Sequence, residues 1–114
     1  MITLDFLRRF GANVDEGMER CLGEEEFYLE MVDMTLADNN FEKLISAVEA
    51  GDKKAAFEAA HALKGITANV ALTPLYKETS EMTELLRAGE DADYPAYLKR
   101  ILALRDELLA EKNG

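Results

Sequence analysis

His61 is the single histidine of the chain and the residue best suited to covalent chemistry. An imidazole of ordinary pKa, ~6.5, is mostly neutral near pH 7, and its free ring nitrogen is a nucleophile that can accept a phosphoryl group. Lys64 follows one helical turn later, where its ammonium would offset part of the charge of such a group. Gly65 costs a helix interior about 1 kcal/mol relative to alanine, so its presence indicates that a side chain is unwanted beside His61.

A helical wheel of the segment from about 52 to 71 turns His61 away from the core. Val70 falls about opposite His61, and four apolar residues lie within ~40° of that direction: Ala56, Ala59, Leu63 and Ile66. The face of His61 also carries charged and small residues, and the surface predicted to contact a partner comprises Phe57, Glu58, Lys54 and Ala68. Phe57 is either an apolar anchor for that partner or a residue tucked under the N-terminal helix, and we hold the two interpretations equal.

Other kinds of chemistry lack the residues that they require. With one histidine and with Cys21 as the single cysteine, the chain offers no intramolecular disulfide and no cluster of metal ligands, so we expect no metal and no cofactor. No nucleophile with an oxyanion-hole motif accompanies His61, and no P-loop or kinase-type glycine loop is present. The competing interpretation from pattern alone is an exposed histidine without a function.

The composition restricts the partners that we expect. The chain of 114 residues carries 23 acidic against 13 basic side chains, a formal net charge of -10, and such a surface repels nucleic acid and anionic membranes. Its partners are therefore expected to be proteins. No apolar run is long enough to span a bilayer, and residues 1–10 lack the apolar core of a signal peptide, so we expect a cytoplasmic protein.

Apolar residues recur at helical spacing along the whole chain, and no segment alternates as a strand does. Short amphipathic helices are expected over residues 2–10 and 14–22. One long helix from about 24 to 50, continuous or kinked near Asn39, is expected next, with two shorter helices as the alternative. This expectation rests on alternating steps of four and three through Phe27, Met31, Met34, Phe41, Ile45 and Val48, in which the polar Asp38 is the one gap.

Three further helices are expected over about 52–71, from Pro74 to Gly89, and from Pro95 towards the C-terminus. Four amphipathic helices joined by short connections form an antiparallel bundle. The fold predicted is therefore all-α, an antiparallel four-helix bundle with short additional N-terminal helices, and residues 1–114 form a single domain.

The segment His61-Ala62-Leu63-Lys64-Gly65, followed by Ala68-Asn69, resembles the H-x-L-K-G signature of histidine-containing phosphotransfer (HPt) domains. Three flanking segments are similar to the family too: Gly23 to Phe27, Ala50-Gly51-Asp52, and a leucine-bearing helix after Thr73 that closes at Ala88-Gly89. The resemblance covers roughly residues 14 to 110 in the right order and spacing.

This resemblance implies a phosphoryl carrier of multistep His-Asp phosphorelays. His61 would be the phosphoacceptor, taking the group from a receiver-domain aspartyl phosphate or from a histidine kinase and passing it to a receiver aspartate. Lys64 would neutralise phosphate charge, and Gly65 would give the partner access. Such domains do not catalyse autophosphorylation, so the resemblance implies no enzyme activity, and the receiver would supply the Mg²⁺ site. A complete small bundle is most simply a monomer.

The sequence departs from the family pattern in two places. Ile66 stands where the family often has serine, and Ala71 where it often has glycine. We interpret Ile66 as a packing change and Ala71 as a helix end made without glycine. Some members steady the imidazole with a polar side chain of the next helix; Thr79 or Thr83 could do so here, and the spacing does not choose between them.

Two rival functions differ in kind from a phosphoryl carrier. The first is a non-catalytic adaptor that docks receiver domains and whose histidine is vestigial; the intact Lys64-Gly65 pair argues against it. The second is an autonomous kinase or phosphatase, against which the missing nucleotide and metal motifs argue.

Overall fold

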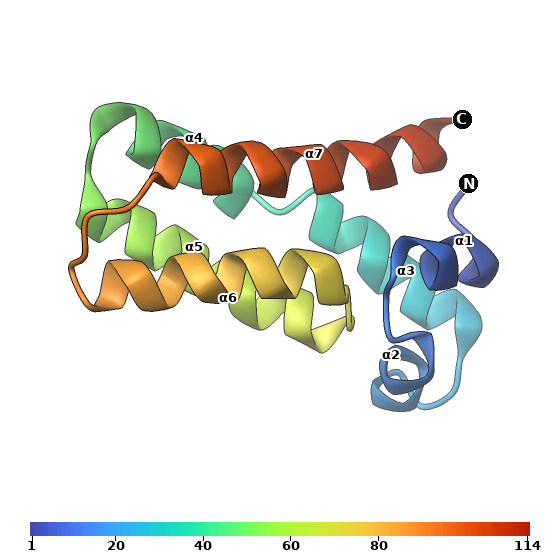
Figure 1. Cartoon of the computed structure of the whole chain (residues 1–114). Helices are drawn as coiled ribbons and strands as arrows, with labels where there is room; N and C mark the ends of the chain where they lie inside the picture. Colours follow the sequence, from blue (N-terminus) through green and yellow to red (C-terminus); the bar gives the residue numbers. More distant parts are fainter.

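The computed structural model describes all 114 residues and contains seven helices and no strand (Figure 1). The fold class predicted from the periodicity is confirmed. The helices are α1 (Leu4–Phe10), α2 (Val14–Arg20), α3 (Glu25–Leu36), α4 (Asn40–Ala50), α5 (Lys53–Asn69), α6 (Thr73–Arg87) and α7 (Tyr94–Asn113).

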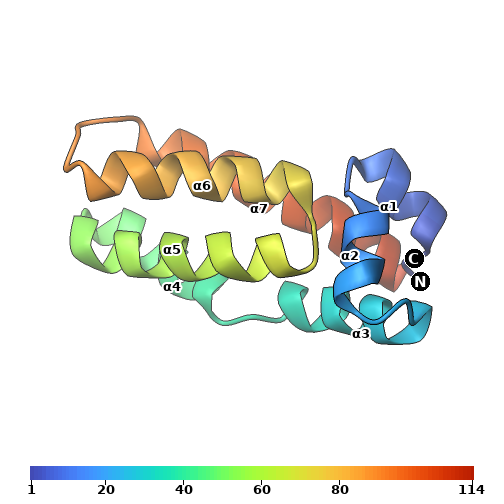
Figure 2. The ribbon, with the colours of Figure 1, turned by 90° about the horizontal axis from the view of Figure 1, so that it is seen from below.

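Helices α4 to α7 form the antiparallel four-helix bundle. Each packs against its neighbour in the chain order α4, α5, α6 and α7, and α7 closes the ring by packing against α4 (Figures 1 and 2). Every bundle helix contributes fully buried side chains to the core. Among them are Phe41, Leu44, Leu63, Leu75, Met82, Ile101 and Leu108. The bundle with short additional N-terminal helices is therefore confirmed.

The single long helix expected from about 24 to 50 is wrong, and the alternative of two shorter helices is correct. The chain leaves the helix after Leu36 and enters α4 at Asn40. The carboxylate of Asp38 accepts hydrogen bonds from both the backbone N–H and the side-chain amide of Asn40, each at 2.8 Å. Short polar side chains compete in this way with the helical hydrogen bonds of the backbone.

Arg105 of the neighbouring helix α7 stabilises this break. Its guanidinium donates to the carbonyl oxygen of Leu36 from Nε at 3.1 Å and from Nη2 at 3.0 Å. The same side chain donates to Glu42 of α4 at 3.2 Å and lies over the ring of Phe41 at 4.6 Å. One arginine thus supplies donors to the last carbonyl oxygen of α3 and contacts the beginning of α4.

The break also changes which face of α3 is buried. Tyr28 and Val32 are fully buried, whereas Phe27 is 42% exposed and Met34 is 63% exposed. The apolar stripe proposed from Phe27 and Met34 is therefore not the core face of this helix. Once the helix is interrupted, α3 and α4 need no common phase, because each packs against the bundle independently.

The N-terminal helices pack against the C-terminal end of α5 through three hydrogen bonds to backbone carbonyls. Arg20 donates to Ala68 at 2.8 Å, the phenol of Tyr28 donates to Val70 at 2.9 Å, and the backbone N–H of Asn13 donates to Ala71 at 3.0 Å. Ala71 follows α5 in the left-handed conformation, with a φ of 54°, so the chain makes this turn without glycine.

The two ends of the chain lie side by side (Figures 1 and 2). The N-terminal ammonium of Met1 donates to the carbonyl oxygen of Glu111 at 2.8 Å. None of the helices has the length and apolar character that crossing a membrane requires.

Candidate functional site

Helix α5 positions the candidate site. The carboxylate of Asp52 caps the helix by accepting from the backbone N–H of Ala55 at 3.1 Å. Alanines provide much of its buried face, which lets α5 approach its neighbours closely. The buried residues are Ala56, Ala59, Ala60, Leu63 and Thr67. His61 lies midway along the helix on the other side and is exposed, as the wheel predicts.

Aromatic stacking orients the imidazole of His61. Its ring lies parallel to that of Phe57, one turn earlier, with centroids 5.6 Å apart and an interplanar angle of 12°. Neither ring nitrogen has a hydrogen-bond partner within the chain. Both nitrogens are therefore available to a group that arrives from outside.

Phe57 is half-buried and is itself covered by a cation from α6. The guanidinium of Arg87 lies 5.1 Å from the centre of its ring. The interpretation in which Phe57 tucks under the N-terminal helix is wrong, because α1 and α2 pack at the opposite end of α5 (Figure 2). Its role as an anchor for a partner stays a prediction.

Lys64 lies on the side of His61 that faces α6. Its ammonium donates to the carboxylate of Glu84 at 3.3 Å, and the other oxygen of Glu84 lies 3.4 Å from Nε of Arg87. The hydrogen bond from Lys64, aided by the charge of Arg87, holds the pKa of Glu84 below its usual value. This carboxylate is therefore charged at neutral pH.

Gly65 has no role in the packing of the chain itself. A Cβ atom built on it would meet no other atom within 4 Å, and the residue is exposed within a regular helix. Gly17 provides a contrast, because a Cβ there would collide with the ring of Tyr28. The space beside His61 is therefore open, which is consistent with the expected approach of a partner.

The other predicted contact residues lie around this open strip. Lys54 and Glu58 are exposed, and Ala68 is half-buried two turns beyond His61. They are thus brought to the same surface of α5 as His61 and Phe57. Their contacts with a partner protein stay predictions.

Neither Thr79 nor Thr83 makes a hydrogen bond to His61, so neither of the two candidates steadies the imidazole in this way. Both are fully buried and donate to carbonyl oxygens of their own helix, at Leu75 (2.9 Å) and Thr79 (2.6 Å) respectively. The register between α5 and α6 turns them inward and places Glu84 and Arg87 at the exposed edge. Sequence reasoning missed both charged residues, because nothing in the pattern of one helix gives that register.

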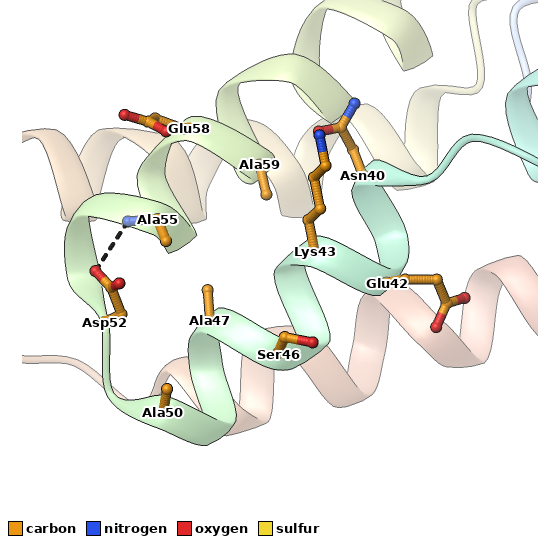
Figure 3. Close-up of a pocket in the computed structure, with 10 residues that line it drawn as sticks. All are labelled: Asn40, Glu42, Lys43, Ser46, Ala47, Ala50, Asp52, Ala55, Glu58 and Ala59. Carbon is orange, nitrogen blue, oxygen red and sulfur yellow. Dashed lines mark hydrogen bonds between the residues drawn. The ribbon is translucent and has the colours of Figure 1, made fainter.

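A separate open groove of about 670 Å³ lies between α4 and α5 (Figure 3). Alanine and serine supply half of its lining residues, and its Asp52 already caps α5. Glu58 contributes to its edge, but His61 does not. No group of three His, Cys, Asp or Glu side chains is arranged to hold a metal ion.

A model of the Hpt domain family matches residues 30–113, which is most of the chain. The comparison with curated proteins and the comparison with solved structures each gave no match. The chain belongs to the Hpt domain family, as its signature predicts. Domains of this family carry phosphoryl groups in two-component phosphorelays, where they interact with receiver domains and histidine kinases. They are phosphocarriers rather than kinases or phosphatases.

Proposed function

We propose that this chain is a phosphohistidine carrier and that His61 is its phosphoacceptor. His61 receives the group from a receiver aspartyl phosphate or a histidine kinase and passes it to a receiver aspartate. The observation that carries the proposal is the exposed imidazole of His61, the one histidine of a chain that belongs to the Hpt family. Residues 1–114 act as one domain, a cytoplasmic monomer without cofactor and without kinase or phosphatase activity of its own.

The transfer step uses a ring nitrogen of His61 as the nucleophile. Its lone pair attacks phosphorus, the P–O bond of the aspartyl phosphate breaks, and the receiver carboxylate leaves with that electron pair. The imidazole gives up one ring proton to the solvent, so the product is a phosphoimidazole with a phosphoryl group of charge near -2. The return step reverses each change, and Lys64 offsets part of the phosphoryl charge in both directions.

The surface around His61 suits a protein partner because it combines an aromatic ring with charged groups. The half-buried ring of Phe57 stacks on the imidazole, with centroids 5.6 Å apart. On the side of α6 lie the charges of Lys64 and Arg87. Aromatic and arginine side chains beside a reactive group favour a docking surface for another protein.

The test uses receiver domains phosphorylated on their aspartates with labelled phosphate. Each is incubated with the wild-type chain and with His61→Gln, and the label is followed on both proteins. We expect acid-labile, base-stable label on the wild type and none on the variant.

Two other results would redirect the interpretation. Binding of a receiver without label on either chain would favour the non-catalytic docking adaptor. Label on both chains would show that the phosphoacceptor is a residue other than His61.

A further inference from the structure

Two cations, Lys64 one turn after His61 and Arg87 over the ring of Phe57, share one carboxylate. Lys64 binds one oxygen of Glu84 at 3.3 Å, and Arg87 lies 3.4 Å from the other. Arg87 also lies over Phe57, which stacks on His61. These five residues form a series of contacts that runs from Lys64 of α5 to Glu84 and Arg87 of α6 and returns to α5 at Phe57 and His61.

The Lys64–Glu84 pair is open to competition from a group on His61. The side chain of Glu84 is 54% exposed and that of Lys64 is 27% exposed, so solvent and an incoming anion can reach both partners. Exposed ion pairs of this kind are weak and exchange readily. A phosphoryl group on His61 would compete with Glu84 for the same ammonium.

The charges show what Glu84 changes. Lys64 and Arg87 carry two positive charges, and Glu84 cancels one of them. A phosphoryl group of charge about -1.5 to -2 therefore meets a surface with one net positive charge rather than two. Without Glu84, both cations would be free to stabilise the phosphorylated state.

We propose that Glu84 is a positioning residue that holds the ammonium of Lys64 against α6 and so limits how strongly this ammonium stabilises phosphorylated His61. This inference rests on the proposed function, because it requires His61 to carry the phosphoryl group. A carrier that must release its group to a receiver aspartate benefits from such a limit. A phosphohistidine stabilised by both cations would accumulate and transfer more slowly.

Phosphoramidate provides a way to load His61 without any partner protein. The ring nitrogen attacks phosphorus, the P–N bond of phosphoramidate breaks, and the proton lost by the imidazole leaves on ammonia. The half-life of the labelled phosphohistidine is then measured at a fixed pH in the wild type and in Glu84→Gln, which removes the charge and keeps the size.

We expect Glu84→Gln to lengthen the half-life about two- to fivefold, the factor that an exposed ion pair supplies. Hydrolysis passes through a loose transition state in which negative charge leaves the phosphoryl oxygens. A freed Lys64 therefore stabilises the phosphorylated ground state more than the transition state. The same variant should transfer its phosphoryl group more slowly to a receiver.

Two comparisons separate positioning of Lys64 from a simple change of charge. In a Lys64→Met background, Glu84→Gln should lengthen the half-life much less, because only Arg87 is left for the substitution to free. Glu78→Gln is the matched control, since Glu78 lies on the same helix but pairs with Arg100 of α7 at 2.9 Å. It should leave the half-life unchanged.

An unchanged half-life in Glu84→Gln would overturn the inference, as would an equal lengthening with and without Lys64. These results differ from a failure of the proposed function, in which the wild-type chain would take no label on His61. That result would remove the premise as well.

Discussion

At the scale of single residues, the site combines a reactive ring with the absence of internal partners for it. His61 is oriented by stacking on Phe57 rather than by a hydrogen bond to either nitrogen. A hydrogen bond from the chain would occupy one nitrogen and fix the tautomer. Stacking restricts the orientation of the ring and leaves both nitrogens without a partner in the chain. This arrangement is consistent with the proposed acceptance and release of a phosphoryl group.

The first prediction concerns Gly65→Ala. Because a Cβ there meets no neighbour and alanine favours helix, we expect the free energy of unfolding to rise by about 1 kcal/mol or less. The added methyl group narrows the open strip beside His61, so transfer from a phosphorylated receiver should slow. Loading by phosphoramidate should not change, because a small donor needs no flat surface. Urea unfolding and the two labelling rates measure these effects.

Gly17→Ala is the matched control for this prediction. There the same methyl group meets the ring of Tyr28, so we expect it to cost about 1–3 kcal/mol of stability without a specific effect on transfer. A loss of stability in Gly65→Ala, or an unchanged rate of transfer from the receiver, would contradict the argument that Gly65 keeps the surface clear.

The residues of the site differ in how far the sequence could predict them. The placement of His61, Lys64 and Gly65 follows from the periodicity of one helix, and the structure has them on one surface. The inward orientation of Thr83 and the position of Glu84 depend on how α6 is rotated against α5. That rotation is set by packing across the interface, which no pattern within a single helix contains.

At the scale of helices, the interruption between α3 and α4 is the largest departure from the prediction. The spacing from Phe27 to Val48 keeps one helical phase across Asp38, and that continuity favoured a single helix. In the structure the carboxylate of Asp38 instead accepts a hydrogen bond from the backbone N–H of Asn40, the first residue of α4. The local hydrogen bonds of a short polar side chain interrupt the helix here even though the apolar spacing would allow it to continue. The interruption leaves the carbonyl oxygen of Leu36 without a helical partner, and Arg105, distant in the sequence, donates to it.

The second prediction tests this role of Arg105. In Arg105→Met the apolar part of the side chain remains, but the hydrogen-bond donors to the carbonyl oxygen of Leu36 are lost. We therefore expect the free energy of unfolding to fall by about 1.5–3 kcal/mol. Arg100→Met is the control on the same helix. Arg100 also lies over an aromatic ring, Tyr97, and pairs with a glutamate, but it caps no helix end.

Removing Arg100 should therefore cost only about 1 kcal/mol or less. Urea denaturation followed by circular dichroism gives both values. Equal losses in the two variants would show that the contacts of Arg105 with the end of α3 contribute little.

At the scale of the whole molecule, the N-terminal helices close one end of the bundle. Helices α1 and α2 and the beginning of α3 precede the residues that match the family. The match begins at residue 30, whereas Arg20 and Tyr28 bind carbonyls at the end of α5. The helix that carries His61 is thereby held at its C-terminal end by residues outside the matched range. We expect loosening of these contacts to lower the stability of the whole chain, because α5 lies at the centre of the packing.

The last prediction concerns Tyr28, whose phenol is fully buried and donates to the carbonyl of Val70. Tyr28→Phe leaves that carbonyl without its partner, so at pH 7 we expect a loss of about 1–3 kcal/mol. Burial raises the pKa of Tyr28 from 10.0 to about 12. The folded chain therefore keeps the phenolic proton over a range in which the unfolded chain releases it.

The sign of the pH dependence follows from this difference. The contribution of Tyr28 is complete below pH 10 and declines as the pH rises towards 12, by up to about 3 kcal/mol. Phenylalanine has no such proton, so the stability gap between the wild type and Tyr28→Phe should narrow over that range. Urea unfolding of both proteins at pH 7, 9 and ~11 measures the gap. The other lysines and tyrosines titrate in both proteins, so their effects cancel in the difference between the two free energies of unfolding. If this difference does not change with pH, the phenol of Tyr28 ionises as readily in the folded chain as in the unfolded one.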